Sequence, residues 1–330
     1  MIFTSKKIFG LLLSTVCMLG LAACGGGGDG GGENFVPAEP AGLMYTGVTS
    51  PAVIGADNAA ELAGDAFIGG ETGSNLKIFS SFVDAQPNIA RKIKLYDVIR
   101  TFDGVLQKID IKDHRGDLLA IDTERDAVLG NCGGVAGYTL EMDDSNGSFT
   151  GSITFNDYCN GNTVVAGTAD FYGQLTVDSG DLLDFNLYLD MVNLTSGDQS
   201  YVIDGDVFVD VARPSYTASI DILMKDSYGE VFWVKDYTLS IYEGVDFADI
   251  EVSGRFYHPT YGYVDLSTIL PVRIFNIDEW PSFGELQIVG EDGTKARLLA
   301  FNNNSCRIVV DTFGDDTYND ESDYMSWSDL

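Results

Sequence analysis

A long stretch of alternating apolar and polar residues constrains the fold of this chain more than any other feature of its sequence. From about residue 118 onward the side chains alternate with period two, and β-branched and aromatic types are frequent. Clusters of Gly, Asn and Asp interrupt this pattern roughly every 8 to 12 residues, as expected for turns between antiparallel strands. In one of the clearest hairpins, Leu286 and Ile288 alternate before a turn at residues 291–293. The sequence therefore predicts an antiparallel β domain over residues 118–330.

A weak internal repeat indicates how these strands are organised. Three dipeptides each precede an expected strand that is centred on a glycine, and an apolar residue stands two positions before each glycine. The pairs are Asp157-Tyr158 with Gly167, Asp190-Met191 with Gly205, and Asp236-Tyr237 with Gly254. A solenoid needs a stricter period than these uneven intervals provide. We therefore predict a mainly β fold with one large antiparallel sheet system, either an open barrel or a sandwich of long hairpins.

Two helical patterns precede the β region and define a short helical section over residues 48–117. The first runs from Asp57 to Phe67, where apolar side chains share one helical face, with Asp57 as the N-cap and Gly69-Gly70 as the stop. The second covers about residues 88–102 behind Pro87 and exposes basic side chains. We expect two amphipathic helices in this section.

Positive and negative charges are distributed unevenly along the chain. Lys and Arg concentrate between Lys77 and Arg125, whereas neither occurs from Asp126 to Ala212. Either both regions are solvated surfaces, or the basic helix packs against the acidic strands and offsets part of their mutual repulsion. Over the whole chain, 50 Asp+Glu oppose 19 Lys+Arg, which gives a formal net charge of -31. A surface this negative repels phosphate, so we expect no nucleic-acid partner.

The N-terminus carries the ordered regions of a bacterial secretion signal. Lys6 and Lys7 precede an apolar run at residues 8–23, which is shorter than the ~20 residues that a helix needs to cross a bilayer. The run ends in Leu21-Ala22-Ala23-Cys24, which resembles a bacterial lipobox whose cysteine thiol accepts a diacylglycerol. We therefore predict a signal peptide over residues 1–23 and lipid attachment at Cys24. The alternative is an ordinary Ala-x-Ala-like cleavage site that leaves this cysteine unmodified.

A glycine-rich segment follows this cysteine, and its composition indicates a flexible tether over residues 24–47. Several acyl chains on one cysteine would make membrane attachment stable, since each buried CH₂ contributes ~0.8 kcal/mol. Gly25, rather than an Asp, follows Cys24, and this pattern resembles lipoproteins sent to the outer membrane. The sequence thus predicts a protein that contacts the cell outer membrane through its covalent lipid and faces the periplasm or the cell surface.

Three further cysteines stand in the expected β domain. Cys132 and Cys159 each lie at the end of an expected strand of one hairpin system, beside Gly and Asn turns. A disulfide between them would close a loop of roughly 30 residues and stabilise the fold by about 3.5 kcal/mol in the chain-entropy model. An envelope location permits such a bond. The alternative is two unpaired thiols near turns, and in either case we expect Cys306 to be an unpaired core residue.

The sequence contains no recognisable catalytic motif. His-Glu-x-x-His, Gly-x-Ser-x-Gly, a phosphate-binding glycine loop and Cys-x-x-Cys are all missing. His114 and His258 stand in turn-rich contexts, and we interpret both as loop residues. A carboxylate pair can catalyse glycoside hydrolysis, but so many acids bring some pairs together by chance. We therefore assign no catalytic residue, and no cofactor beyond the calcium considered below.

Several scattered motifs resemble a group of Gram-negative, β-rich lipoproteins of unassigned function that have a Gly-rich N-terminal tether. They are Asp57-Asn58-Ala59-Ala60-Glu61-Leu62-Ala63 with Gly69-Gly70, Cys132-Gly133-Gly134, Thr154-Phe155-Asn156-Asp157-Tyr158-Cys159, and the hairpins from Gly284 to Asp311. The resemblance covers most of the chain after the signal peptide. It implies an envelope location and a β architecture, and it implies no activity.

The resemblance also implies a candidate calcium site near the C-terminus. In that group this turn resembles Asp-x-Asp-Gly-Asp-Gly, whose carboxylates suit a hard cation. The candidate ligands in this chain are Asp311, Asp315, Asp316 and Asp320. Phe313 stands where a ligand is expected, and Asp316 replaces a turn glycine. The alternatives are therefore a weak calcium site and a solvated acidic turn.

A cluster of aromatic residues between Phe232 and Tyr263 admits two interpretations. Cross-strand packing in a sheet is the usual role of such residues, and an exposed platform for a sugar or a lipid chain is the alternative. For the whole chain we predict a non-catalytic binding or structural component of the cell envelope, with an unknown ligand or envelope protein as partner. The alternatives are a carrier of lipid or another hydrophobic ligand and, from a third class, a glycan hydrolase.

Overall fold

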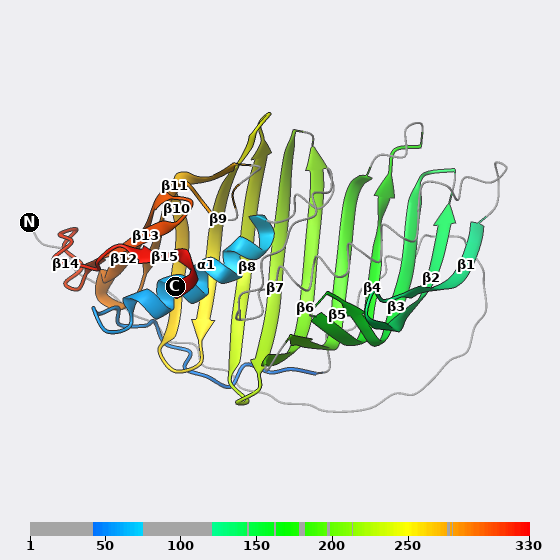
Figure 1. Ribbon diagram of the computed structural model, residues 1–330, viewed down its shortest axis with the longest axis horizontal. Coiled ribbons are helices and arrows are strands. Elements are labelled where there is room, and N and C mark those ends of the chain that lie inside the picture. The colour runs from blue at the N-terminus through cyan, green and yellow to red at the C-terminus, as the bar shows by residue number, and fades with distance from the viewer. Residues whose placement is uncertain are drawn as a thin grey trace, which may run out of the picture. The chain divides into compact units, whose positions relative to one another are not determined.

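Figure 1 shows the computed structural model of the chain. The structure describes residues 42–74, 121–143, 145–161, 163–177, 182–196, 199–212, 214–275, 278 and 280–330. These residues all belong to one structural unit, Pro40–Leu330. The expected signal peptide, the lipid site at Cys24, most of the tether and the basic helix over residues 88–102 lie outside the described residues and stay predictions.

In the described residues, fifteen strands form one large antiparallel sheet, and from β1 to β14 each strand pairs with the next one along the chain (Figure 1). The strands are β1 (Ile121–Leu129), β2 (Gly133–Asp143), β3 (Ser148–Asn160), β4 (Thr163–Leu175), β5 (Leu182–Ser196), β6 (Gln199–Ala212), β7 (Ser215–Asp226), β8 (Val231–Glu243), β9 (Phe247–His258), β10 (Gly262–Phe275), β11 (Phe283–Val289), β12 (Lys295–Asn302), β13 (Ser305–Asp311), β14 (Asp320–Glu321) and β15 (Met325–Ser326). Both β14 and β15 pair with β13, and the sheet is not closed into a barrel. The prediction of a mainly β fold built on a large antiparallel sheet is therefore confirmed.

Alternation along each strand gives the sheet an apolar face and a polar face. On β4, Val165, Ala169 and Phe171 are buried, whereas Asp170 between them is exposed. We call the apolar side the inner face and the side of Asp170 the outer face. Three inner-face rings on adjacent strands have centroids 6.2 to 6.4 Å apart, namely Phe149, Phe171 and Phe185. Such burial supplies the main stabilisation of the fold, at roughly 25 cal/mol per Å² of apolar surface.

β-Bulges explain the weak repeat in the sequence. In each bulge a residue at positive φ stands close to a glycine of the neighbouring strand, and the pairing register shifts there. The pairs are Asp157 (φ 50°) with Gly167 (φ 130°), Met191 (φ 50°) with Gly205 (φ 140°), and Asp236 (φ 51°) with Gly254 (φ 152°). A side chain at Gly254 would place its Cβ atom 2.7 Å from the Cα atom of Tyr237, which leaves no room for one. The repeated dipeptide and glycine therefore mark bulges that bend successive hairpins.

The helix α1 (Ala59–Ser74) packs against the inner face and crosses β8 and β9 (Figure 1). Leu62, Ala66 and Phe67 are buried, and the hydroxyl of Tyr237 on β8 donates to the Ala66 carbonyl oxygen at 3.1 Å. Two short 3₁₀ helices, η2 (Glu291–Gly293) and η3 (Trp327–Asp329), follow later in the chain. None of the helices in the described ranges is long and apolar enough to cross a membrane.

The prediction of the first helix is correct in place but wrong at both ends. α1 begins at Ala59, so Asn58 rather than Asp57 precedes it, and the Asn58 side chain closes the preceding turn through hydrogen bonds to backbone groups. The helix also continues through Gly69-Gly70 to Ser74. A glycine in a helix interior costs about 1 kcal/mol, which weakens the helix without ending it.

The segment before α1, residues 42–58, connects the two faces of the sheet, and we call it the strap. On the outer face, the backbone N–H of Leu43 donates to Asp204 Oδ2 at 2.7 Å, and the ring of Tyr45 lies 6.1 Å from that of Trp233. The strap then forms a parallel bridge from Pro51 to Tyr263 of β10 and continues into α1. Residues 43 and 45, which the sequence assigned to the flexible tether, therefore contact the sheet.

Candidate functional site

Two acids and a histidine meet where α1 contacts the end of β9. Glu61 and Asp65 are one helical turn apart on α1, which puts both carboxylates on the same side of the helix. His258 is the last residue of β9, and its Nε2 atom lies 3.5 Å from Glu61 Oε1 and 3.7 Å from Asp65 Oδ2. The three residues bring one potential metal-ligand atom each within 4.8 Å of one another. We call these three residues the His258 cluster.

The hydrogen bonds of His258 fix its protonation state. Its side chain is 5% exposed, and its Nδ1 atom accepts the backbone N–H groups of Thr260 at 3.1 Å and Tyr261 at 3.4 Å. A nitrogen that accepts carries no proton, so the proton of the neutral imidazole is on Nε2, which faces the two carboxylates. Burial lowers the pKa of His258, although the nearby carboxylates act in the opposite direction. The imidazole is therefore neutral at pH 7.

This tautomer argues against a metal ion in the His258 cluster. A neutral imidazole binds a metal through its unprotonated nitrogen, and its other nitrogen then donates a proton. In His258 the unprotonated nitrogen already accepts two backbone N–H groups, and the nitrogen nearest the carboxylates is a donor. A metal at Nε2 would require a proton on Nδ1, directly opposed to those two N–H groups. We therefore interpret the cluster as a hydrogen-bonded joint between helix and sheet.

Two aromatic residues complete this joint. The hydroxyl of Tyr261 donates to Glu61 Oε2 at 2.9 Å, which ties the turn between β9 and β10 to α1. The rings of Phe232 and His258 meet edge to face, with centroids 5.3 Å apart. The interpretation of His258 as a loop residue is wrong, because it is buried at the end of a strand. The signal that could have placed it is the period-two alternation with Phe256, which it continues; His114 lies outside the described residues.

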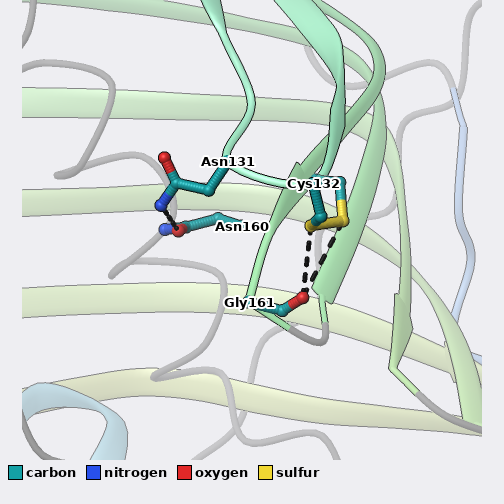
Figure 2. Close-up of a disulfide and its surroundings, with 5 residues drawn as sticks. Asn131, Cys132, Asn160 and Gly161 are labelled. Carbon is teal, nitrogen blue, oxygen red and sulfur yellow. Dashed lines mark hydrogen bonds between the residues drawn. A yellow bond between two sulfur atoms is a disulfide. The ribbon is translucent and has the colours of Figure 1, made fainter.

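The predicted disulfide between Cys132 and Cys159 is confirmed (Figure 2). Their Cα atoms lie 5.2 Å apart, within the usual range for a disulfide. Beside it, the side-chain amide of Asn131 donates to Asn160 Oδ1 at 2.9 Å (Figure 2). A covalent link and a hydrogen bond thus join the turn between β1 and β2 to the end of β3. Cys306 is a free, buried cysteine as predicted, and burial raises the pKa of its thiol to about 12.

The turn after β13 is organised by Asp311, which the resemblance made a candidate calcium ligand. Asp311 is fully buried, and its Oδ1 atom accepts the backbone N–H of Gly314 at 2.8 Å while its Oδ2 atom accepts that of Asp316 at 2.8 Å. Two longer hydrogen bonds come from the N–H groups of Phe313 and Asp315. Burial alone would raise the pKa of the Asp311 carboxyl, but the backbone hydrogen bonds outweigh burial and lower it.

The other candidate calcium ligands form different interactions from those of Asp311. Asp316 forms an ion pair with Lys295, and Asp315 and Asp320 each accept a backbone N–H from a nearby residue. Among the residues that the structure describes, these four aspartates do not gather their carboxylates into a metal-type group. The sequence pattern shows how many acids the turn contains, but it does not show that backbone N–H groups already donate hydrogen bonds to Asp311. We therefore propose no calcium site at this turn.

The outer face of β4–β7 carries a row of carboxylates that we call the acidic strip: Asp170, Asp184, Asp206, Asp210 and Asp221. Asp184 stands directly opposite Asp210, and Asp206 stands opposite Asp221. Burial raises the pKa of Asp170, Asp184, Asp206 and Asp221, and the charge of a neighbouring carboxylate raises each of these four pKa values further. The sequence has no Lys or Arg on β4, β5 or β6, so these strands supply no basic partner of their own.

The aromatic cluster of β8–β10 divides between the two faces of the sheet. On the outer face, Trp233 stacks on Tyr257 with centroids 4.9 Å apart, and Tyr257 contacts Tyr263 at 5.3 Å. Arg255 lies over the Tyr263 ring at 3.9 Å and Lys235 over the Trp233 ring at 4.4 Å. These contacts are the packing that the sequence favoured for the cluster. The cations occupy ring faces that a sugar platform would need.

No family model, curated protein or solved structure matches this chain. The resemblance to Gram-negative lipoproteins therefore stays a prediction based on its motifs. Function has to be inferred from the residues themselves, which supply a lipobox-like N-terminus, a disulfide, an acidic outer face and a buried histidine joint.

Proposed function

We propose that the protein is a lipid-anchored, non-catalytic component of the bacterial outer membrane, with a binding or structural role in the cell envelope. The observation that carries this proposal is Leu21-Ala22-Ala23-Cys24 at the end of a short apolar run behind two lysines. The disulfide between Cys132 and Cys159 supports it, because disulfides persist in the oxidising compartments outside the cytosol. A chain that is secreted and lipidated in this way stays at the membrane surface while its β domain faces the aqueous phase.

A non-catalytic role is supported by the interactions of His258 and of the acids Glu61, Asp65 and Asp311. Glu61 and Asp65 face a neutral His258 whose second nitrogen accepts backbone N–H groups. Asp311 is likewise occupied by backbone N–H groups. A glycan hydrolase needs two carboxyl groups about 5 to 10 Å apart across a space for the sugar. The acids of the His258 cluster instead converge on one imidazole, where they stabilise the fold.

The outer face indicates which partners suit a binding role. The acidic strip combines raised carboxyl pKa values with the absence of any basic residue on β4–β6. Such a surface repels phosphate and anionic lipid headgroups, and it tolerates neutral or basic partners. A polyanionic ligand is therefore the least suitable class, and an envelope protein with a neutral or basic surface is the most suitable.

Lipid attachment is tested by replacing Cys24 and, as a matched control, Cys17, which the proposal places inside the signal peptide. Cells that produce each variant are fed an alkyne analogue of palmitate, and the captured protein is examined for label and for signal cleavage. Cys24→Ala is expected to abolish labelling and to block normal cleavage, whereas Cys17→Ala keeps both wild-type properties. Wild-type labelling of Cys24→Ala would show that the anchor is elsewhere.

The role at the membrane is tested by identifying what co-purifies with the wild-type protein in mild detergent. Recovery of one envelope protein in a stoichiometric amount is expected for a binding or structural component. Recovery of one specific lipid in a stoichiometric amount would instead support the carrier alternative. Turnover of an added envelope glycan by the pure protein would contradict the non-catalytic assignment.

A further inference from the structure

We propose that the His258 cluster is an acid-sensitive clamp, which releases α1 from the sheet when the Nδ1 atom of His258 is protonated. The inference concerns a conformational device and does not depend on the proposed envelope role. It rests on where the histidine stands, on which groups face each of its nitrogens, and on the side chains that hold α1 against the sheet.

On the sheet side, the turn after β9 is one of the points at which the strap binds the sheet. The His258 carbonyl oxygen accepts the Tyr45 hydroxyl at 2.9 Å, and the Pro259 carbonyl oxygen accepts the Val48 N–H at 3.1 Å. The same turn is closed by the hydrogen bonds from Thr260 and Tyr261 to Nδ1 of His258. Loss of the hydrogen bonds to Nδ1 would therefore disturb the same short turn that binds the strap.

On the helix side, side chains hold α1 in place. Glu61 accepts the Tyr261 hydroxyl, and both Glu61 and Asp65 face Nε2 of His258. Tyr237 adds one hydrogen bond to the carbonyl oxygen of Ala66. α1 itself is not part of the strand ladder, so its release breaks none of the ladder hydrogen bonds that join the strands. Local opening of such an element costs less free energy than global unfolding.

Protonation at Nδ1 opposes the closed arrangement directly. The added N–H would point at the N–H groups of Thr260 and Tyr261, so both hydrogen bonds that close the turn would be lost. The carboxylates around the ring favour its protonation, because Glu61, Asp65 and Glu230 all attract an imidazolium. Burial outweighs that attraction, and the pKa of His258 is lowered in the closed state.

The direction of the pH effect follows from this difference between the closed and open states. A solvated histidine has a pKa of about 6.5, so an open state binds a proton more readily than the closed state does. The contribution of His258 to closure is therefore fully present above about pH 6.5 and is lost as the pH falls towards the lowered closed-state pKa. Acidification favours opening, which exposes the buried side chains of Leu62, Ala66 and Phe67.

Hydrogen exchange of the full-length protein tests the clamp. Exchange of amides in residues 59–67 is compared at pH 7.5 and pH 5.5, after correction for the intrinsic rate at each pH. In wild type the opening constant of this segment is expected to rise severalfold, up to about tenfold, at the lower pH. His258→Gln should remove most of this rise, and His114→Gln should keep it. Equal pH dependence in wild type and in His258→Gln would overturn the clamp.

A second measurement needs no substitution at the clamp. The chain has two histidines, so the imidazole signals of the wild type can be assigned by comparison with His114→Gln and titrated by NMR. We expect a pKa for His258 below 6.5 and a chemical shift typical of a neutral ring with the proton on Nε2. A pKa at or above 6.5 would contradict the proposal even if His258→Gln fails to fold.

Discussion

The carboxylates at the two ends of the outer face have neighbours of opposite charge. On β4–β7 carboxylates stand opposite carboxylates, and burial together with the carboxylate opposite raises the pKa of Asp184 and Asp206. On β9–β12 carboxylates stand beside arginines, at 2.7 Å for Arg255 with Asp265, 2.7 Å for Arg273 with Asp249 and 2.8 Å for Arg297 with Glu285. Both ends nevertheless belong to one sheet with one apolar inner face. Outer-face charge therefore does not decide whether the strands form.

The comparison separates what specifies the fold from what sets its response to pH. Asp184 and Asp206 of the acidic strip have a folded-state pKa above the unfolded value of 3.8, so they stabilise the fold below about pH 4 and lose that contribution as the pH rises through the folded-state pKa. Asp311 has a lowered pKa, so its contribution is present above the unfolded value and is lost as the pH falls through the folded-state pKa. The two regions thus give pH dependences of opposite sign.

The disulfide joins the end of β3, the strand next to the acidic strip, to the turn before β2, and breaking that bond should have the largest effect. The double variant Cys132→Ala with Cys159→Ala is expected to lose about 3.5 kcal/mol of unfolding free energy, because the unfolded chain regains the entropy of an open loop. Urea denaturation of the oxidised proteins measures the loss. A reducing agent should lower the stability of wild type to that of the variant and should not affect the variant. Equal stabilities of oxidised wild type and variant would contradict this.

At the end of β13, the strand next to the paired end, loss of the buried Asp311 carboxylate should have the next largest effect. Asp311→Ala leaves the backbone N–H groups that its carboxylate accepts without a partner, and we expect a loss of about 2 to 3 kcal/mol. Asp315→Ala, in the same turn but with an exposed side chain, should cost well under 1 kcal/mol. Chemical denaturation at pH 7 compares the two, and similar losses would show that Asp311 does not organise the turn.

Much of the fold could be predicted because local sequence patterns specify it. Period-two alternation gave the strands, and the dipeptide-and-glycine repeat coincides with the bulges near Gly167, Gly205 and Gly254. The choice between a barrel, a sandwich and one open sheet could not be made from the sequence. Alternation specifies which face of a strand is apolar, but the curvature of the sheet depends on how all the hairpins pack together.

The candidate sites also divide into those that a local sequence pattern predicts and those that it does not. The bond between Cys132 and Cys159 was predictable because both residues end strands that are close along the chain. The His258 cluster was not, since it joins residues 61 and 65 to a residue almost two hundred positions later, and no local pattern reports such an approach. The role of Asp311 was missed because its partners are backbone N–H groups, which any sequence supplies.

The paired end of the outer face should respond to salt, with a smaller effect than either change above. Arg255 binds Asp265 through two hydrogen bonds, at 2.7 and 3.1 Å, but both side chains are more than a third exposed. Arg255→Met keeps the apolar stem and is expected to cost about 0.5 to 1 kcal/mol at low ionic strength. The loss should shrink in 1 M salt, because salt screens exposed charges. If the loss of stability is the same in 1 M salt, its cause is the lost packing of Arg255 on Tyr263 and not the lost charge.

The acidic end should give the smallest effect, with the opposite sign. Asp206 has its pKa raised by burial and by Asp221 opposite, so its charge opposes folding at neutral pH. Asp206→Asn removes that charge and keeps the size of the side chain. We expect a gain of about 0.5 kcal/mol at pH 7, a value typical of like charges on adjacent strands.

The sign of this change across pH makes the test specific to charge. At pH 3 the raised pKa leaves Asp206 protonated in the folded state, so the variant and the wild type should then have nearly equal stability. Asp265→Asn is the matched control from the paired end, where loss of a carboxylate beside Arg255 should destabilise the fold at pH 7. Urea denaturation of both variants at the two pH values provides the comparison. If Asp206→Asn also destabilises the fold at pH 7, the two ends of the outer face do not differ in the way their charges suggest.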